Sequence, residues 1–180
     1  MSRVDLLTTE DVTDERGDVL DQIHGAFGFV PNMFKAVANS PAALQSMWGS
    51  FGALGAGTLG AKIGEQIAVA VADRNRCDYC LSAHTLLGKK AGATAEEMTE
   101  AQKGYSADPR TAAILTLATE LVDQRGQIDA DAVRSARDAG LTSEDIVETI
   151  AHVALNVFTN YINLALDVPV DFDRVRLTAK

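Results

Sequence analysis

Helix start and stop signals recur along this 180-residue chain, and hardly any segment alternates apolar and polar residues with the strand period of two. Ser40 precedes Pro41, which places a capping hydroxyl before a proline at the first helical position. Thr94 and Glu97 have the spacing of a capping box. These signals predict an all-α fold, a bundle of about eight helices.

The chain is expected to form a single domain over residues 1–180, because its length suits one core and no interdomain linker interrupts it. Residues 1–16 are acidic and are expected to form a loosely held arm. The last long helix is expected from Thr142 to about Ala165, followed by an extended tail over residues 167–180.

The charge balance argues against nucleic acid as a partner. Sixteen Lys and Arg stand against 25 Asp and Glu, and no basic run is interleaved with aromatic residues. The run Ile67–Ala72 is far shorter than the roughly 20 residues of a membrane span, so no membrane association is expected. The first residues lack the pattern of an export signal, which favours a cytoplasmic location, where thiols are more often catalytic or metal-binding than structural.

Both cysteines and one of the three histidines lie in a single short segment. On a helix, Cys77 and Cys80 are one turn apart, and Cys80 and His84 are at positions i and i+4, so the three side chains share one stripe. Such a dithiol can close into a disulfide, and His84 can take a proton from Cys80. Arg74 and Arg76 are expected to supply cations that favour the thiolate.

Two other interpretations of this segment stay open. The thiols can be inert and buried beside an unrelated histidine, or Cys77, Cys80 and His84 can supply three ligands to zinc. A second pair of zinc ligands is missing, so no metal site is predicted. Glu65 lies in an apolar stretch and is either a desolvated proton-relay partner of His84 or a solvent-facing carboxylate.

The last helix is apolar nearly all round, which predicts burial in the core or against another subunit. A thin polar stripe, His152, Asn156, Asn160 and Asn163, follows the helical spacing. These side chains either satisfy one another in an interface or line a pocket, for which His152, Asn156, Asn160 and Tyr79 are the candidates. A short echo, Glu65-x-Ile-Ala and Glu148-x-Ile-Ala, is too brief to establish a duplication.

Glu65, the Cys77-x-x-Cys80-x-x-x-His84 spacing and the segment Leu86–Gly92 resemble the alkylhydroperoxidase D group of the carboxymuconolactone decarboxylase family. The neighbouring helices extend this similarity over residues 32–171, and the segment 27–32 and the Asn-rich last helix resemble a peroxidase-related branch. The resemblance implies an all-helical alkylhydroperoxidase D-like fold, assembly as trimers or hexamers, and no metal, haem or flavin cofactor.

The resemblance also implies a role for each residue. Cys80 would be the peroxidatic cysteine and Cys77 the resolving cysteine, and Glu65 with His84 would form the proton relay. Archetypal members have a histidine immediately before the second cysteine, whereas this chain has Tyr79.

These observations predict an oxidoreductase, a thiol-dependent peroxidase that reduces organic or hydrogen peroxides and is reset by an external dithiol or a thiol protein. Three alternatives use the same residues differently: a general disulfide oxidoreductase, a carboxymuconolactone decarboxylase-like enzyme, and a non-catalytic oligomeric redox sensor. Decarboxylation does not depend on a cysteine pair, so Cys77 and Cys80 argue against it. We expect a homo-oligomer because 180 residues leave few other helices to surround the last one.

Overall fold

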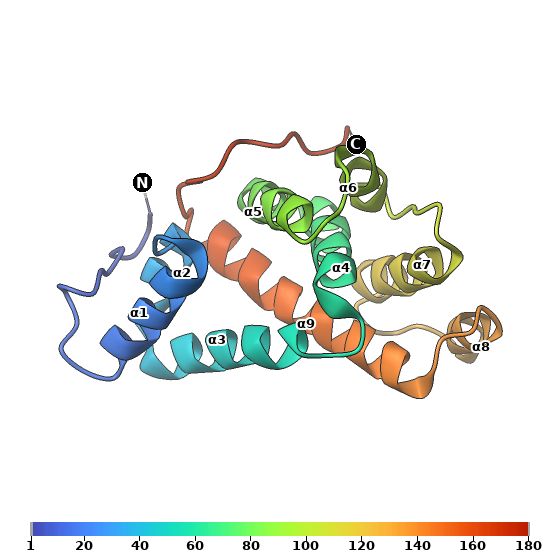
Figure 1. Cartoon of the computed structure of the whole chain (residues 1–180), viewed down its shortest axis with the longest axis horizontal. Coiled ribbons are helices and arrows are strands. Elements are labelled where there is room, and N and C mark those ends of the chain that lie inside the picture. The colour runs from blue at the N-terminus through green and yellow to red at the C-terminus, as the bar shows by residue number, and fades with distance from the viewer. Residues whose placement is uncertain (1, 180) are drawn as a thin grey trace.

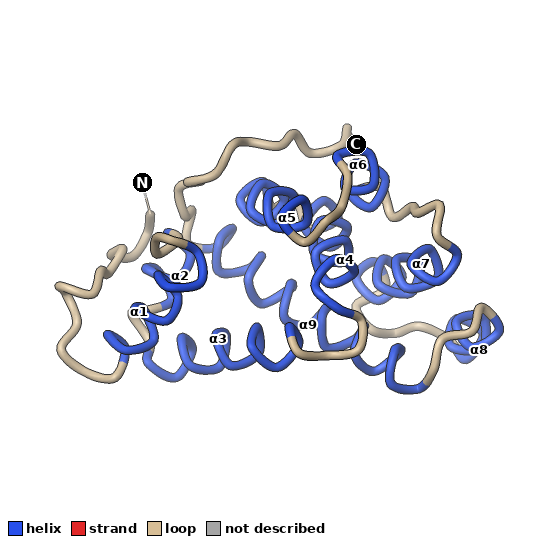
Figure 2. Tube along the Cα trace, in the orientation of Figure 1, coloured by secondary structure: helices blue, strands red, loops and turns tan. Residues whose placement is uncertain are grey.

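The computed structural model describes residues 2–179, and within that range it contains nine helices and no strand (Figures 1 and 2). The all-α prediction is confirmed, with one helix more than the approximate count. The helices are α1 (Arg16–Phe27), α2 (Asn32–Val37), α3 (Pro41–Gly55), α4 (Gly60–Arg74), α5 (Asp78–Lys90), α6 (Ala95–Gln102), α7 (Pro109–Asp123), α8 (Ala130–Asp138) and α9 (Ser143–Ala165).

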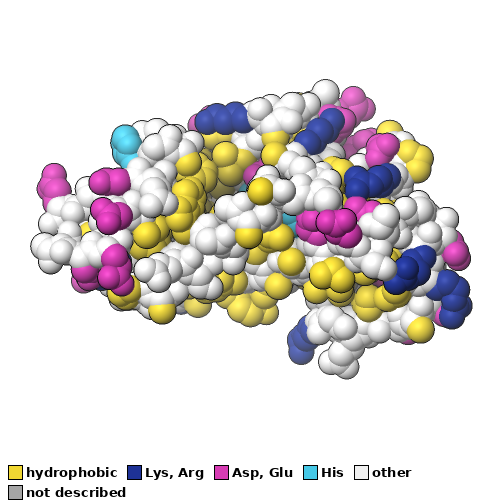
Figure 3. All heavy atoms as spheres, turned by 60° about the horizontal axis from the view of Figure 1, so that its bottom comes forward, with side chains coloured by type: hydrophobic (Ala, Val, Ile, Leu, Met, Phe, Trp, Pro, Cys, Tyr) yellow, Lys and Arg dark blue, Asp and Glu magenta, His cyan; other side chains and the backbone are white. Residues whose placement is uncertain are grey.

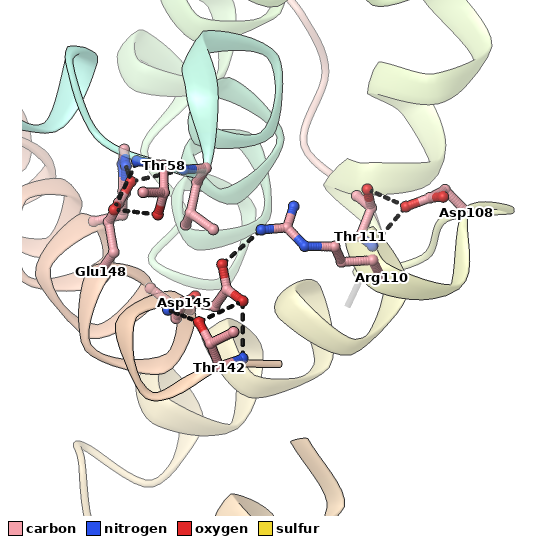
Figure 4. Close-up of polar contacts among 10 residues, drawn as sticks. Thr58, Asp108, Arg110, Thr111, Thr142, Asp145 and Glu148 are labelled. Carbon is pink, nitrogen blue, oxygen red and sulfur yellow. Dashed lines mark hydrogen bonds and ion pairs between the residues drawn. The ribbon is translucent and has the colours of Figure 1, made fainter. Parts of the chain in front are cut away.

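Several helices begin where the sequence places a capping side chain. Thr94 and Glu97 make the reciprocal hydrogen bonds of a capping box at α6. Thr142 and Asp145 do the same at α9, and Arg110 of α7 donates to Asp145 at 2.6 Å (Figure 4). The cap of α9 is therefore also a tie between α7 and α9.

Helix α4 is the centre of the bundle and packs against α3, α5, α6, α7 and α9. Figure 1 shows α4 between α5 and α9. The apolar run Ile67–Ala72 is buried on every side, with at most 2% of any side chain exposed. A helix covered all round needs no polar face, which explains why this run shows no amphipathic pattern.

Glu148 clamps the first half of α9 to the turn before α4. Its carboxylate accepts hydrogen bonds from the backbone N–H groups of Thr58 and Leu59 and from the Thr58 hydroxyl, each at 2.9 Å (Figure 4). A Cβ atom at Gly57 would lie 2.2 Å from this carboxylate, so the turn requires a residue without a side chain there.

The N-terminal arm, expected to be loosely held, is attached to the body of the protein. The backbone N–H of Arg3 donates to the carbonyl of Leu166, and that of Leu7 donates to the carbonyl of Lys35. The side chain of Val12 is buried in the core. The arm is acidic, but its apolar residues are spaced so that they pack inward, which the charge count does not reveal.

The segment after α9 forms no regular secondary structure and runs over α5 and α6 (Figure 1). Its Val175 N–H donates to the Ser82 hydroxyl at 3.0 Å, and its Thr178 N–H donates to the buried carboxylate of Asp73 at 2.9 Å. The tail therefore covers the first turns of α5.

Helix α9 is the longest helix in the described chain. The sequence predicted that it is buried, but one of its apolar faces is exposed. Val147 and Tyr161 are 64% and 61% exposed, and Ile150 and Leu164 are also exposed. This apolar face has no partner within the described chain, so of the two expected kinds of burial, in the core or against another subunit, the first does not apply to this face. No helix in residues 2–179 combines the length and the apolar character needed to cross a membrane.

Candidate active site

The turn between α4 and α5 sets the geometry of the cysteine pair. Helix α4 ends at Arg74, and Arg76 takes a left-handed conformation with φ of 62°. Cys77 then becomes the N-cap residue of α5, and its Sγ accepts a hydrogen bond from the backbone N–H of Cys80 at 3.3 Å. The reversal lays α5 along α4, so residues from both helices meet in one site.

Glu65 of α4 pairs with His84 of α5, with 2.7 Å between Oε2 and Nδ1. The side chains are 22% and 9% exposed, so Glu65 is not the solvent-facing carboxylate of the alternative interpretation. Burial disfavours the charged imidazole, but the carboxylate more than offsets it, so the pKa of His84 lies above its ordinary value. The other ring nitrogen, Nε2, is left free to exchange a proton.

The two thiols are both reduced and buried, and their environments differ. A hydrogen bond to Cys80, together with burial, raises the pKa of Cys77. Burial also opposes ionisation of Cys80, but the Cys77 thiol, the charge of His84 and nearby amides together lower the pKa of Cys80. Cys80 is therefore the sulfur that favours the thiolate, and Cys77 is the one that keeps its proton.

The arginines expected beside the thiols bind elsewhere. Arg74 forms an ion pair with Asp123 at 3.3 Å, and Arg76 donates to the backbone carbonyl of Thr178 at 2.7 Å. The positive charge near Cys80 comes from His84 instead. Within residues 2–179, no group of three or more His, Cys, Asp and Glu side chains is placed to hold a metal ion.

Cys80 and His84 line a cavity of about 30 Å³, which is room for about two water molecules. Its walls are mostly apolar, and the aromatic rings come from distant parts of the chain: Phe27, Phe34, Phe51, Tyr79 and Phe172. Such a site excludes bulk water while exposing the sulfur to a small solute.

Tyr79 lines this cavity with its ring, which packs edge-on against Phe172 of the tail at 5.6 Å between centroids. Its hydroxyl accepts a hydrogen bond from the backbone N–H of Met33 at 3.1 Å. Burial raises the pKa of Tyr79. Tyr79 therefore joins α2 to α5 and forms part of the cavity wall.

The polar stripe of α9 divides between two cavities. His152 and Asn156 line a second cavity of about 100 Å³, together with Glu65 and His84. Asn160 lines neither cavity, because its Oδ1 accepts a hydrogen bond from Asn75 at 2.9 Å.

Asn163, which lay in the stripe but not among the expected pocket residues, donates from Nδ2 to the Cys80 sulfur at 3.1 Å. It also lines the cavity beside Cys80. Its spacing from Asn160 and Asn156 was the only signal for it. Phe172, in the tail, had no local signal.

Comparisons with known proteins agree with this geometry. Residues 41–120, from α3 to α7, match the model of the carboxymuconolactone decarboxylase family, which confirms the family resemblance seen in the sequence. No curated protein matches the chain significantly.

Solved structures share the fold over almost the whole chain. A peroxidase-related protein with an alkylhydroperoxidase AhpD core from Ralstonia eutropha JMP134 is 22% identical, with a TM-score of 0.83, over 94% of this chain and 92% of its own. A peroxidase-related protein from Silicibacter sp. TM1040 is also 22% identical, with a TM-score of 0.82, over 93% and 91%. A form of the debrominase Bmp8 in complex with 2,3,4-tribromopyrrole is 19% identical, with a TM-score of 0.80, over 93% and 91%.

Proposed function

Since residues 41–120 match the model of the carboxymuconolactone decarboxylase family and the chain has an alkylhydroperoxidase D-like fold, we propose that this protein is a thiol-dependent peroxidase. Its substrates are hydrogen peroxide or organic hydroperoxides. One observation carries the proposal: a cysteine whose pKa is lowered stands beside a charged histidine at a small, water-excluding cavity.

In the first step, the Cys80 thiolate attacks the hydroxyl oxygen of the hydroperoxide. The S–O bond forms as the O–O bond breaks, Cys80 becomes a sulfenic acid, and the leaving alkoxide takes the proton held by His84. That proton came from the Cys80 thiol, so the step is balanced. Glu65 keeps the imidazole charged and oriented until the proton is transferred.

In the second step, the Cys77 thiol attacks the sulfenic sulfur of Cys80. A disulfide forms, the S–O bond breaks, and the hydroxyl leaves as water with the proton of Cys77. The high pKa of Cys77 keeps it protonated while Cys80 reacts, so the two sulfurs act in sequence. An external dithiol then supplies two electrons and two protons to restore both thiols.

The burial of the sulfurs favours peroxide over a protein disulfide as the oxidant. Cys77 and Cys80 are 0% and 2% exposed, and the tail covers the start of α5. A peroxide group fits a cavity of about 30 Å³, whereas a protein disulfide does not. Re-reduction of the disulfide by a protein dithiol would then require the tail to move aside, whereas re-reduction by a small dithiol would not.

A second thiol reaction, reductive debromination, is suggested by the debrominase that shares this fold. The aromatic walls of the cavity suit a halogenated ring as well as an organic hydroperoxide. Peroxide reduction is placed first because two of the solved structures that share this fold are peroxidase-related proteins. Bromide release from 2,3,4-tribromopyrrole at a rate above that of peroxide reduction would reverse this order.

We further propose that the protein assembles as a homo-oligomer through α9. Figure 3 shows hydrophobic side chains gathered on the face that carries α3 and α9. Grooves on both sides of α9 are lined mainly by apolar residues, with Phe158 on one side and Val157 and Tyr161 on the other. An exposed apolar strip of this kind is typical of a subunit interface.

The test of the proposed function is stopped-flow oxidation of the reduced protein, followed by intact mass. With hydrogen peroxide or cumene hydroperoxide, the wild-type chain should lose two hydrogen atoms, as expected for a disulfide. Cys77→Ser should gain a single oxygen atom on Cys80, and Cys80→Ser should not react at an appreciable rate. A sulfenic acid that forms on Cys77 in the Cys80→Ser protein at the wild-type rate would contradict the assignment.

A further inference from the structure

The sulfur of Cys80 receives help from a helix that does not belong to the cysteine motif. Asn163, 83 residues further along the chain, donates from Nδ2 to the Cys80 Sγ at 3.1 Å. Asn163 is only 4% exposed, so the bond is made away from water. A hydrogen bond to a charged acceptor is strongest in such surroundings.

A second amide of α9 lies beside the same sulfur. The Oδ1 of Asn160 accepts a hydrogen bond from Asn75, the C-cap residue directly after α4, and this fixes which way the amide points. Its Nδ2 is completely buried and makes no hydrogen bond within the described chain. The nearness of this group still contributes to the lowered pKa of Cys80.

The polar atoms of this stripe are less well paired than a structural network would be. The described chain contains four buried side-chain polar atoms without a hydrogen-bond partner, and three of them belong to the α9 stripe: Nε2 of His152, Nδ2 of Asn160 and Oδ1 of Asn163. Buried amides that only stabilise a fold are normally satisfied. Among these atoms, Nδ2 of Asn160 is the donor close to Cys80, so it is available to a negative charge that is present only when the sulfur is a thiolate.

We propose that the side-chain amides of Asn163 and Asn160, which we call the donor cradle, stabilise the sulfur of Cys80 as a thiolate, with Asn163 as the main donor. The use of this thiolate to reduce peroxide rests on the proposed function, whereas the effect of the two amides on Cys80 does not. The cradle acts by a route independent of the Glu65–His84 pair, because it comes from α9 and carries no charge.

The other groups that bear on the ionisation of Cys80 lie mainly on α5 and α4. They are the Cys77 thiol, His84 with Glu65 behind it, the neighbouring phenol of Tyr79, and the Asp171 carboxylate of the tail beside that phenol. What α9 adds is a pair of neutral donors, so its contribution is separable by substitution.

A donor to the sulfur has two opposite effects on reactivity. It increases the fraction of thiolate at neutral pH, and it also makes each thiolate a weaker nucleophile, with a Brønsted slope of about 0.4–0.5. Loss of one hydrogen bond to a charged group corresponds to a pKa rise of about 1–2 units. Each unit costs about threefold in rate below the pKa and gains about threefold above it.

The experiment is the rate of Cys80 alkylation by iodoacetamide, read by peptide mass, between about pH 5 and pH 10, alongside ultraviolet titration of the thiolate. Asn163→Leu should raise the pKa of Cys80, slow alkylation about three- to tenfold at neutral pH, and accelerate it by a similar factor at high pH. A crossover of this kind is not expected from a general loss of structure. Asn163→Asp, which is almost the same size, should raise the pKa further and serves if the leucine variant does not fold.

The matched control is Thr159→Val, a buried residue of α9 whose hydroxyl bonds only the backbone carbonyl of Asn156. Its alkylation profile should coincide with that of the wild type. An unchanged or lowered pKa of Cys80 in Asn163→Leu would overturn the proposal, because the amide would then be a spectator or an acceptor for the thiol proton. Alkylation needs no peroxide, so it tests the effect of Asn163 on Cys80 independently of the proposed function. Absence of peroxidase activity in the wild type and all variants would refute the proposed function without changing the alkylation result.

Discussion

Replacing Glu65 with Gln removes the charge of the Glu65–His84 pair and keeps its shape. The pair is 2.7 Å long and its histidine is 91% buried at the side chain, so little solvent screens it. A neighbouring opposite charge of this kind is worth about 1–3 pKa units to the imidazole. Without it, burial, which is the largest influence on His84, is opposed only by the smaller influence of the Cys80 charge, so the pKa of His84 should fall below the usual value of about 6.5.

A neutral His84 has two consequences for catalysis. It no longer stabilises the Cys80 thiolate, and it carries no proton for the leaving alkoxide. Loss of acid–base assistance typically costs about 10²–10⁴-fold, so Glu65→Gln and His84→Ala should each lose peroxide reduction by a factor in that range at neutral pH. Because the two residues act as one unit, the double variant should lose scarcely more than the worse single variant.

The assay is the second-order rate of Cys80 oxidation by stopped flow, with Glu10→Gln as the control. Glu10 is exposed on the N-terminal arm, and its replacement also removes one carboxylate. The control should retain the wild-type rate. Fully additive losses in the double variant would mean that Glu65 and His84 work independently, and wild-type activity in Glu65→Gln would remove Glu65 from the relay.

The same substitution makes a prediction for stability, with a definite sign. The folded-state pKa of His84 is raised, so the pair contributes fully below the unfolded value of about 6.5 and is lost as pH rises through the folded pKa. Urea unfolding should therefore show Glu65→Gln to be less stable by about 1–3 kcal/mol near pH 6, with a smaller deficit near pH 9. A deficit that does not change with pH would refute this electrostatic account.

Two further predictions concern α9. Glu148→Gln should destabilise the protein by about 1–3 kcal/mol at pH 7, because the carboxylate accepts three hydrogen bonds from the 57–59 turn. Burial opposes the charge of Glu148, but these hydrogen bonds lower the pKa of its carboxyl group below the ordinary value of about 4.5. In urea titrations, the loss of unfolding free energy in Glu148→Gln should therefore shrink as pH falls below that value. A loss that grows in acid would contradict this account. Light scattering should report a mass that is a multiple of the 19.1 kDa chain. Tyr161→Glu, at an exposed site, should shift the mass toward that of the monomer, whereas Glu144→Gln, also at an exposed site, should not. A wild-type monomer at micromolar concentration would contradict the assembly proposal.

Helix boundaries were predictable because the signals that set them are local. The helix expected from Thr142 to about Ala165 is observed as α9, Ser143–Ala165, with Thr142 as its capping residue. The stripe of Cys77, Cys80 and His84 was predictable for the same reason, since three residues within two helical turns have a fixed relation.

The partners of those residues depend on packing that no local pattern encodes. Arg74 and Arg76 are near Cys77 in sequence, but their long side chains bind Asp123 and the tail, so proximity along the chain misassigned them. Phe172 and Cys80 are 92 positions apart in the sequence, and they line one cavity only because the tail folds back over α5.

The contact between Asn163 and Cys80 could not be predicted for a related reason. It joins residues 83 positions apart, and the stripe of α9 alone was equally compatible with amides that satisfy one another. What decides between the two interpretations is the set of unpaired buried atoms, which exists only once the helices are packed.

The echo between Glu65-x-Ile-Ala and Glu148-x-Ile-Ala shows how the same short sequence acquires different chemistry. Glu65 and Cys80 lie on two helices joined by a turn, whereas Glu148 and Asn163 lie on the single helix α9, so the two segments do not share a helix pair. Glu65 holds an imidazole, and Glu148 holds a backbone turn.

The arrangement gives α9 two fixed points, Glu148 on the 57–59 turn and Asn163 on the Cys80 sulfur. These residues are 15 positions apart, which is about 22 Å along a helix with a rise of 1.5 Å per residue. Because a helix resists stretching over that length, the turn at one end sets where the amide lies at the other. The position of the Cys80 sulfur in its donor cradle is therefore determined by the packing of the whole of α9, and not by the cysteine motif alone.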